Sequence, residues 1–266
     1  MHQICLLLFC LLCTCVRAQN IEVVDTETED GYDITVANHE LVPVSVTFDF
    51  ELNNLTFRHP VADTIVLPPQ SRQTVIHLVQ QQKGKGYGYS HRYRYNYGDY
   101  RVLPYDTAFV YQLPFAAGKA VRIIQGYDGG YSHQGKAALD FNLPEGTPVY
   151  AARGGKVIRV VDSFDRRCMD QACAKYNNYV TVLHSDGTYG EYTHLRKDGS
   201  AVTVGEEVNT GDLLAYSGNT GYSSGPHLHF AVYRQRFDRR DYVPTVFAVA
   251  GQAEPVQLVE GGSYGR

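Results

Sequence analysis

Apolar residues alternate with polar ones along much of this chain, and no segment has a sustained helical period. Val44, Val46 and Phe48 alternate with smaller or polar residues, which is the pattern of a half-buried strand. Similar runs in the first half, separated by polar turns, lie at residues 21–24, 32–37, 42–52, 63–67, 74–79 and 108–113. The sequence therefore predicts an all-β protein, in which residues 245–250 are the best candidate for a short helix.

The runs fall into two groups, so we expect two β domains. Their spacing of about ten residues within residues 19–115 predicts a β-sandwich-like N-terminal domain. A change of register near residues 113–118 precedes a second β domain over residues 116–250. Residues 251–266, rich in glycine and polar groups, are expected to be a weakly ordered C-terminal tail. A chain of 266 residues is long enough for two such domains.

The first eighteen residues have the pattern of a secretory signal peptide. An apolar run over residues 4–16 leads to the small residue Ala18, after which cleavage is expected. The run is too short to span a bilayer, and no later stretch has the roughly 18–20 apolar residues of a membrane helix. Lipidation at Cys13 or Cys15 is the alternative, but the residues before them fit a lipidation site poorly. We therefore expect a secreted or periplasmic protein.

Cysteine usage and charge narrow the remaining possibilities. Cys168 and Cys173 are the cysteines left after leader removal, and in an exported protein such a pair predicts a small disulfide. A structural zinc site would need a second pair of cysteines. The formal net charge is −4 with scattered Lys and Arg residues, which indicates no nucleic-acid partner.

Aromatic residues occupy every second position of one segment. They are Tyr87, Tyr89, His91, Tyr93, Tyr95 and Tyr97. An extended strand would carry them on one face. Packing of this face inside the protein is the favoured interpretation, and an exposed platform for stacking sugar rings is the alternative.

Two histidines stand two residues apart in the segment Gly225-Pro226-His227-Leu228-His229-Phe230. On a strand, His227 and His229 project from the same face, whereas Leu228 and Phe230 point into the core. Two imidazoles side by side form either a metal site or an acid–base pair.

Asp140 and His194 lie on other predicted strands. Leu139 and Phe141 belong to an apolar face, which turns Asp140 to the opposite side. A carboxylate there needs a partner, either a divalent cation or an arginine. His194 is expected to share a strand face with Tyr192, and such a histidine taken alone is more often structural than catalytic.

Several motifs follow one another in a family-specific order. They are His133 followed by Ala138-Leu139-Asp140-Phe141, then Pro144-Glu145-Gly146-Thr147-Pro148-Val149, Tyr192-Thr193-His194-Leu195, and Ser217-Gly218-Asn219-Thr220-Gly221 leading into Gly225-Pro226-His227-Leu228-His229-Phe230. This succession resembles the lysostaphin-type (LytM-like) zinc metalloendopeptidases, which are peptidoglycan hydrolases. The resemblance covers about residues 120–235.

The resemblance implies an antiparallel β catalytic domain in which Zn2+ is held by His133, Asp140 and His229. It also makes His194 and His227 the two catalytic histidines. The interval between His133 and Asp140 is seven residues, whereas most members have four. Three protein ligands leave a fourth position at zinc for water, which the metal can make acidic enough to act near neutral pH.

The sequence therefore predicts a secreted zinc metalloendopeptidase that hydrolyses peptide bonds in peptidoglycan cross-links or stem peptides. A noncatalytic cell-wall-binding protein, or an activator of another wall hydrolase, is the alternative. A metal-free β adhesin or carbohydrate-binding protein leaves the histidines and aspartate unexplained. The expected partner is a peptidoglycan peptide, with no nucleic acid and no membrane segment after leader cleavage.

Overall fold

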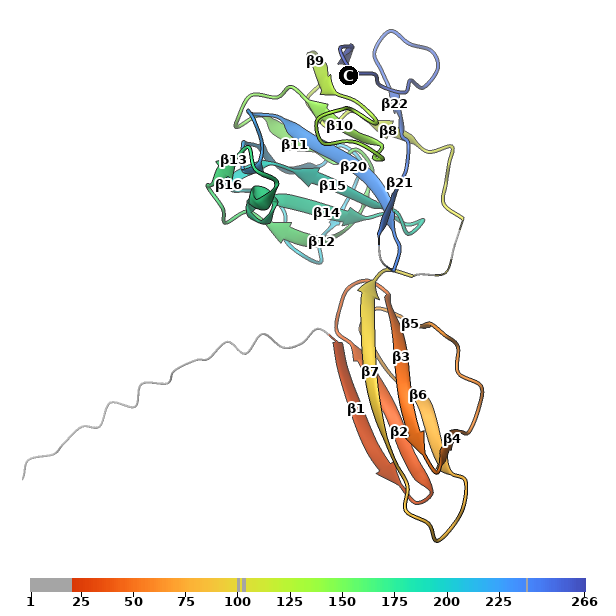
Figure 1. The fold of residues 1–266 in the computed structure, drawn as a ribbon. Coiled ribbons are helices and arrows are strands. Elements are labelled where there is room, and N and C mark those ends of the chain that lie inside the picture. Colours follow the sequence, from red (N-terminus) through yellow and green to blue (C-terminus); the bar gives the residue numbers. More distant parts are fainter. Residues whose placement is uncertain (1–20, 100, 102–103, 238) are drawn as a thin grey trace, which may run out of the picture.

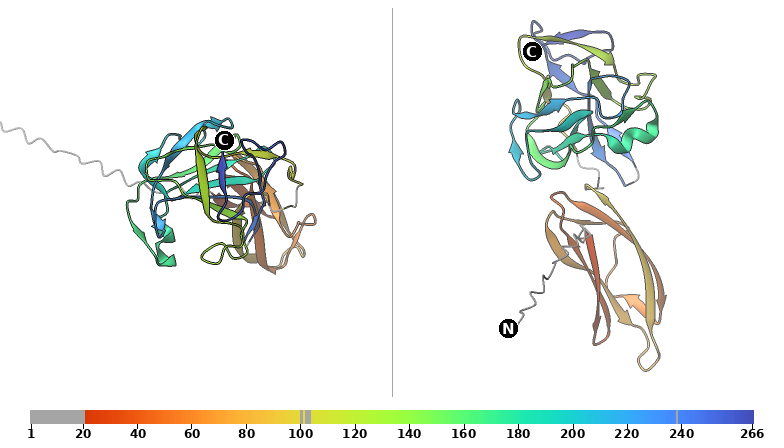
Figure 2. Two further views of the ribbon diagram at one scale, coloured as in Figure 1. Left: turned by 90° about the horizontal axis from the view of Figure 1, so that it is seen from above. Right: turned by 90° about the vertical axis from the view of Figure 1, so that its left-hand side faces the viewer.

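The computed structural model describes residues 21–99, 101, 104–237 and 239–266. Two β bodies meet end to end, the N-terminal body of residues 21–97 and the C-terminal body of residues 110–265 (Figures 1 and 2). Within these described ranges the one helix is the 3-10 segment η1 (Gln171–Tyr176), so the prediction of an all-β protein is confirmed. None of the described residues form a helix long and apolar enough to cross a membrane. The expected signal peptide lies outside the described residues.

The N-terminal body consists of two antiparallel sheets. In spatial order, the strands of the first are β1 (Ile21–Thr28), β2 (Gly31–Asn38), β6 (Ser71–Gln80) and β4 (Leu55–Phe57), and those of the second are β5 (Ile65–Leu67), β3 (Val44–Asn53) and β7 (Gly88–Tyr97). Val36 of the first sheet and Val46 of the second are fully buried in one apolar cluster. The two sheets therefore pack face to face, as the right-hand view of Figure 2 shows.

The alternating aromatic residues of β7 pack largely inside the N-terminal body. The ring of Tyr89 lies 4.8 Å from that of Tyr32 on the opposite sheet, and the ring of His91 lies 5.5 Å from that of Phe50. Tyr95 is 43% exposed. The favoured interpretation of this face as a packing surface agrees with these contacts.

The C-terminal body is built on one antiparallel sheet. In spatial order its strands are β17 (Glu207–Val208), β12 (Gly155–Val161), β14 (Tyr179–Leu183), β15 (Tyr189–Thr193), β20 (Leu228–Gln235), β10 (Ala138–Phe141), β9 (Ala120–Gln125) and β23 (Ser263–Gly265), with β21 (Arg240–Tyr242) paired to β20. Smaller sheets are β11 (Pro148–Tyr150) with β18 (Leu213–Ser217) and β16 (Leu195–Ser200), and β13 (Arg167–Cys168) with β19 (Gly221–Tyr222). The inward residues Phe141, Val180 and Phe230 are buried in one core.

The segment before residue 116 packs with the C-terminal body, not with the N-terminal one. Strand β8 (Val110–Gln112) pairs in parallel with β22 (Val246–Ala248), the segment expected to be helical. Leu113 and Phe115 are buried in the core of the C-terminal body. By packing, the two bodies are therefore divided between β7 and β8, on the amino-terminal side of the expected position.

The C-terminal residues are also part of the fold. Strand β23 pairs with β9, and Val256 bridges Phe247. Leu258 is 1% exposed within the core of the C-terminal body. The expectation of a weakly ordered tail over residues 251–266 is therefore wrong. The pairing of β23 with β9 and the burial of Leu258 fix these residues against the C-terminal body.

The N-terminal body contacts the C-terminal body at one end of β15 and β20. Val42 packs in a cluster with Tyr189 and Tyr233 at that end. Tyr189 pairs with Tyr233, four residues along the ladder from the pair Thr193–His229. At about 3.3 Å per residue, the contact lies roughly 13 Å from His229. The N-terminal body is thus placed at the far end of these strands from the predicted site.

His184 is a buried histidine outside the predicted site. It is 2% exposed, and its Nδ1–H donates to Thr188 Oγ1 at 2.9 Å. Burial, together with the nearby Arg153 guanidinium, lowers the pKa of His184 to about 3. In the unfolded chain His184 takes up a proton at about pH 6.5, whereas in the folded protein it does so only near pH 3. The folded state therefore loses stability relative to the unfolded state as the pH falls from about 6.5 to 3.

We expect His184→Gln to flatten this pH dependence. The wild-type protein should lose up to about 1.4 kcal/mol more than the variant for each pH unit between these two pKa values. Urea unfolding of both proteins across this window measures the difference. Equal slopes in the two proteins would contradict the assignment.

Candidate metal centre

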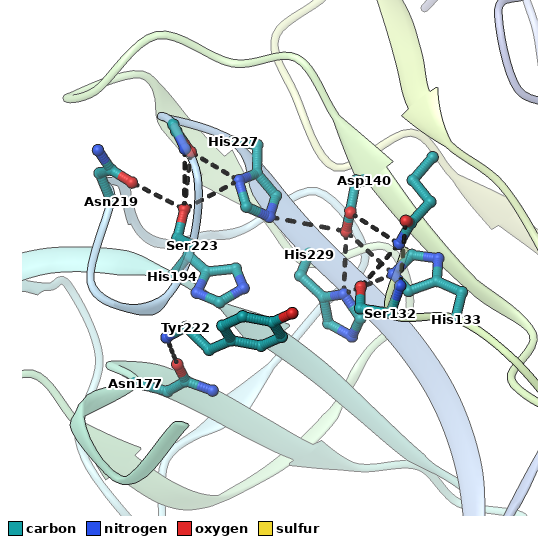
Figure 3. Close-up of polar contacts among 12 residues, drawn as sticks. Ser132, His133, Asp140, Asn177, His194, Asn219, Tyr222, Ser223, His227 and His229 are labelled. Carbon is teal, nitrogen blue, oxygen red and sulfur yellow. Dashed lines mark hydrogen bonds and ion pairs between the residues drawn. The ribbon is translucent and has the colours of Figure 1, made fainter. Parts of the chain in front are cut away.

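Asp140 and His229 face each other across adjacent strands. They are directly paired in the ladder between β10 and β20. Leu139 and Phe230, their neighbours in the chain, are buried in the core on the other side of the sheet. The alternation of strand side chains therefore turns both polar groups toward one face, where His229 Nδ1 lies 2.9 Å from Asp140 Oδ1 (Figure 3).

His133 reaches the same place from the loop between β9 and β10. It is fully buried, and its Nδ1–H donates to the Gly126 carbonyl oxygen at 2.9 Å. Its Nε2 lies 3.2 Å from His229 Nδ1 and 3.3 Å from Asp140 Oδ1. The hydrogen bond to Gly126 leaves a neutral His133 with an Nε2 lone pair directed at these two atoms.

The three facing atoms fit a divalent cation. Their separations of 2.9–3.3 Å compare with about 3.3–3.6 Å between donors in a tetrahedral zinc site with bonds of about 2.0–2.2 Å. Electron-rich atoms that converge this closely are stabilised by a cation between them. Among the described residues, His133, Asp140 and His229 are the one group of three that could hold a metal ion.

Asp140 is held in its ionised form. Burial by itself raises the pKa of this carboxyl group, but contacts with the imidazoles of His133 and His229 outweigh burial and hold the pKa well below its usual range. An ionised, almost buried carboxylate beside two imidazoles is the donor set expected of a zinc site.

His194 and His227 lie beside these three residues. Their ring centres are 4.5 Å apart, and His227 Nε2 lies 3.8 Å from Asp140 Oδ1. The Nδ1–H of His194 donates to the Thr220 carbonyl oxygen at 2.7 Å, and that of His227 donates to the Gly225 carbonyl oxygen at 2.8 Å. In each ring the Nε2 atom therefore carries a lone pair.

Burial keeps both rings neutral. It lowers the pKa of His194 to about 3, assisted by the neighbouring His227 and His229, and it also lowers the pKa of His227. Both imidazoles are therefore unprotonated at Nε2 near neutral pH.

The position of His194 differs from the expected one. Tyr192 points into the core, where its hydroxyl oxygen accepts a hydrogen bond from the Ala152 amide at 2.8 Å. Strand β15 ends at Thr193, and His194 has a φ of 65°. This left-handed conformation breaks the alternation and turns His194 away from Tyr192, to within 6.0 Å of the His229 ring centre. The prediction that His194 and Tyr192 share a strand face is wrong.

Two supporting residues were not identified from the sequence. Gln125 pairs with Asp140 across β9 and β10, and its Nε2 donates to Asp140 Oδ2 at 3.4 Å and to Ser132 Oγ at 2.8 Å. Ser223 Oγ donates to the Gly225 carbonyl oxygen at 2.8 Å and lies 3.4 Å from His227 Nδ1. Alternation assigns Gln125 to the core face with Val121 and Ile123, and the register shift between Asp140 and Phe141 pairs it with Asp140 instead.

Comparisons with known proteins agree on one family. The model of Peptidase family M23 matches residues 133–241. Lysostaphin of Staphylococcus simulans is 31% identical over 147 residues, which are 53% of this chain and 24% of the relative. Peptidoglycan DD-endopeptidase ShyA of Vibrio cholerae serotype O1 is 36% identical over 91 residues, which are 34% of this chain and 18% of the relative.

One solved structure similar to this chain is the catalytic domain of the antimicrobial peptidase lysostaphin from Staphylococcus simulans. It is 28% identical, and the match covers 43% of this chain and 79% of that domain with a TM-score of 0.33. The chain spans about a quarter or less of the length of the curated relatives it matches.

Proposed function

Residues 133–241 are a domain of peptidase family M23, and from this membership we propose that the chain is a zinc metalloendopeptidase that hydrolyses peptide bonds in peptidoglycan cross-links or stem peptides. The observation that carries the proposal is the convergence of three metal-binding atoms with two neutral histidines on one face of the sheet. Lysostaphin and a peptidoglycan DD-endopeptidase among the relatives support the substrate class.

His133, Asp140 and His229 are proposed to hold the ion. Bound zinc supplies Lewis-acid activation of water and of the scissile carbonyl group. The Gly126 carbonyl oxygen fixes the His133 ring so that Nε2 faces the centre, and Gln125 supports Asp140 through Oδ2.

His194 and His227 are proposed as the catalytic residues. Each ring is oriented by a backbone carbonyl oxygen at Nδ1, so that Nε2 can accept a proton from the attacking water and deliver it to the leaving amine. A histidine that has accepted this proton can donate a hydrogen bond to the developing oxyanion. A noncatalytic wall-binding protein, or an activator of another hydrolase, would require neither histidine at this place.

Removal of the metal tests the proposal. We expect one zinc ion per purified chain and cleavage of purified peptidoglycan that is lost on chelation and returns when zinc is added. Metal analysis and release of soluble fragments measure the two properties. Digestion that continues after complete and verified metal removal would refute the metalloenzyme, and mass spectrometry of the fragments identifies the bond that is cut.

We also propose that the chain is secreted or periplasmic after cleavage behind Ala18. Cys168 and Cys173 are bonded in the structure with a Cα–Cα distance of 5.9 Å, and such a bond suits an oxidising compartment. The exported protein should begin at Gln19 and contain no free thiol. A mature chain that retains residues 1–18 would contradict the proposed leader.

A further inference from the structure

Two tyrosine rings meet over the metal centre. Tyr131 comes from the loop that carries His133, and Tyr222 lies on β19, so the pair joins segments far apart in the sequence. The ring centres are 5.8 Å apart with an angle of 22° between the planes, which is a stacked arrangement. Figure 3 shows the Tyr222 ring beside His194 and His229. Tyr131 is 54% exposed and therefore lies at the mouth of the groove.

The tyrosine pair lies where two hollows meet. One hollow of about 300 Å³ is lined by Glu191, Thr193 and Asn177, and the other, of about 500 Å³, is lined by Asn142 and Pro226. Tyr131, Tyr222, His194 and His229 line both. An extended peptide with its scissile bond at the histidines and its two ends in the two hollows would pass the two rings.

The position of Tyr222 depends on the segment that contains the disulfide. Strand β19 pairs in parallel with β13, where Cys168 is the partner of Tyr222. The Ser223 amide donates to the Cys168 carbonyl oxygen at 3.2 Å, and the Tyr222 amide donates to Asn177 Oδ1 at 3.1 Å. Cys173, the other half of the disulfide, is buried in η1.

Gly221 makes a further close contact that positions Tyr222. It has a φ of 76°, and a Cβ atom there would lie 1.6 Å from Asn177 Oδ1. No larger residue fits between β19 and Asn177, so the backbone beside Tyr222 is fixed by direct contact.

We propose that Tyr131 and Tyr222 form a clamp that holds the substrate peptide between the two hollows, and that the Cys168–Cys173 disulfide sets the position of Tyr222. This inference rests on the proposed peptidase function and assigns two substrate-positioning residues to it. The rings offer broad apolar faces to the peptide and hydroxyl groups to its backbone. Neither residue belongs to the metal-binding or proton-transferring set.

The kinetic test compares Tyr131→Ala and Tyr222→Ala with the wild-type enzyme on a soluble cross-linked peptide from peptidoglycan. We expect each substitution to raise KM about tenfold, to leave kcat within about threefold, and to leave one zinc ion per chain. Phenylalanine at either position, which keeps the stacking, should recover most of the affinity. Tyr95→Ala, which removes an exposed tyrosine of the N-terminal body, is the matched control.

The role of the disulfide is tested by combining variants. Cys168→Ser/Cys173→Ser should raise KM less than Tyr222→Ala does, and should add little to the effect of Tyr222→Ala, because both act on one ring. Full additivity would overturn the link to the disulfide. An unchanged KM in both alanine variants would overturn the clamp. Tyr131→Ala keeps the test valid if Tyr222→Ala does not fold, since Tyr131 is exposed.

Binding separates failure of the clamp from failure of the proposed function. The affinity for the same peptide is measured for the His227→Ala protein and for the double variant His227→Ala/Tyr222→Ala. The Kd of the double variant is expected to be about tenfold higher. If the wild-type chain cuts no peptidoglycan peptide but Tyr222→Ala still weakens binding, the peptidase proposal fails and the clamp stands. Equal affinities, or no binding to either protein, overturn the clamp.

Discussion

Asp140→Ala is expected to remove the metal and with it all peptide hydrolysis. The carboxylate is one of the three proposed ligands and the only anion among them, so its loss would leave two imidazoles. Loss of a residue that merely supports a ligand costs roughly 10–100-fold in metal affinity, and loss of a ligand should cost more. Zinc content after dialysis and the rate of fragment release measure the two effects.

Matched variants show whether the loss of zinc and hydrolysis is specific to the proposed metal centre. His229→Ala should likewise lose the metal. Asp33→Asn removes a carboxylate that also contacts a histidine, with 2.7 Å between Asp33 and His77, but lies in the N-terminal body, so zinc and activity should persist. An Asp140→Ala protein that is folded and keeps stoichiometric zinc would contradict the assignment of this ligand.

His194→Ala and His227→Ala are expected to keep the metal and lose cleavage. Neither ring belongs to the group of three proposed metal ligands, whereas both present an Nε2 lone pair beside it. General acid–base groups contribute typically 10²–10⁴-fold to a rate, so kcat should fall by about that factor in each variant. Zinc analysis together with kcat on a soluble peptide separates the two roles.

The double variant His194→Ala/His227→Ala extends this test. If the two histidines act on one proton-transfer path, the double variant should be little slower than the slower single variant. His39→Ala, at an exposed histidine in the N-terminal body, should change neither zinc content nor kcat. Loss of zinc from a folded His194→Ala or His227→Ala protein would move that residue into the set of ligands.

Period-two alternation predicted the positions of most strands. The predicted runs at residues 32–37 and 42–52 are found as β2 and β3 with shifts of one or two residues at their ends. Alternation is a local property, so it locates strands without the rest of the chain. It does not say which strands pair, and the pairing of β8 with β22 and of β23 with β9 joins segments more than one hundred residues apart.

The site was only partly contained in such local patterns. The joint orientation of His227 and His229 follows from their spacing, and the turning of Asp140 away from Leu139 and Phe141 follows from the strand. His133 lies in a loop, where no periodicity predicts a direction, and it depended on the family resemblance. The roles of all these residues stay predictions until the variants are measured.

The sequence by itself determined the β class, the family and the residue types of the centre, because alternation and short motifs are read along one segment at a time. The tertiary structure decided the features that depend on backbone conformation and on contacts between distant segments. The left-handed backbone of His194 turns this ring out of the core face, and the buried Leu258 orders an apparently loose tail. It also brought Tyr131 and Tyr222 together. Each of these depends on contacts between distant segments, whose energies no single stretch of sequence contains.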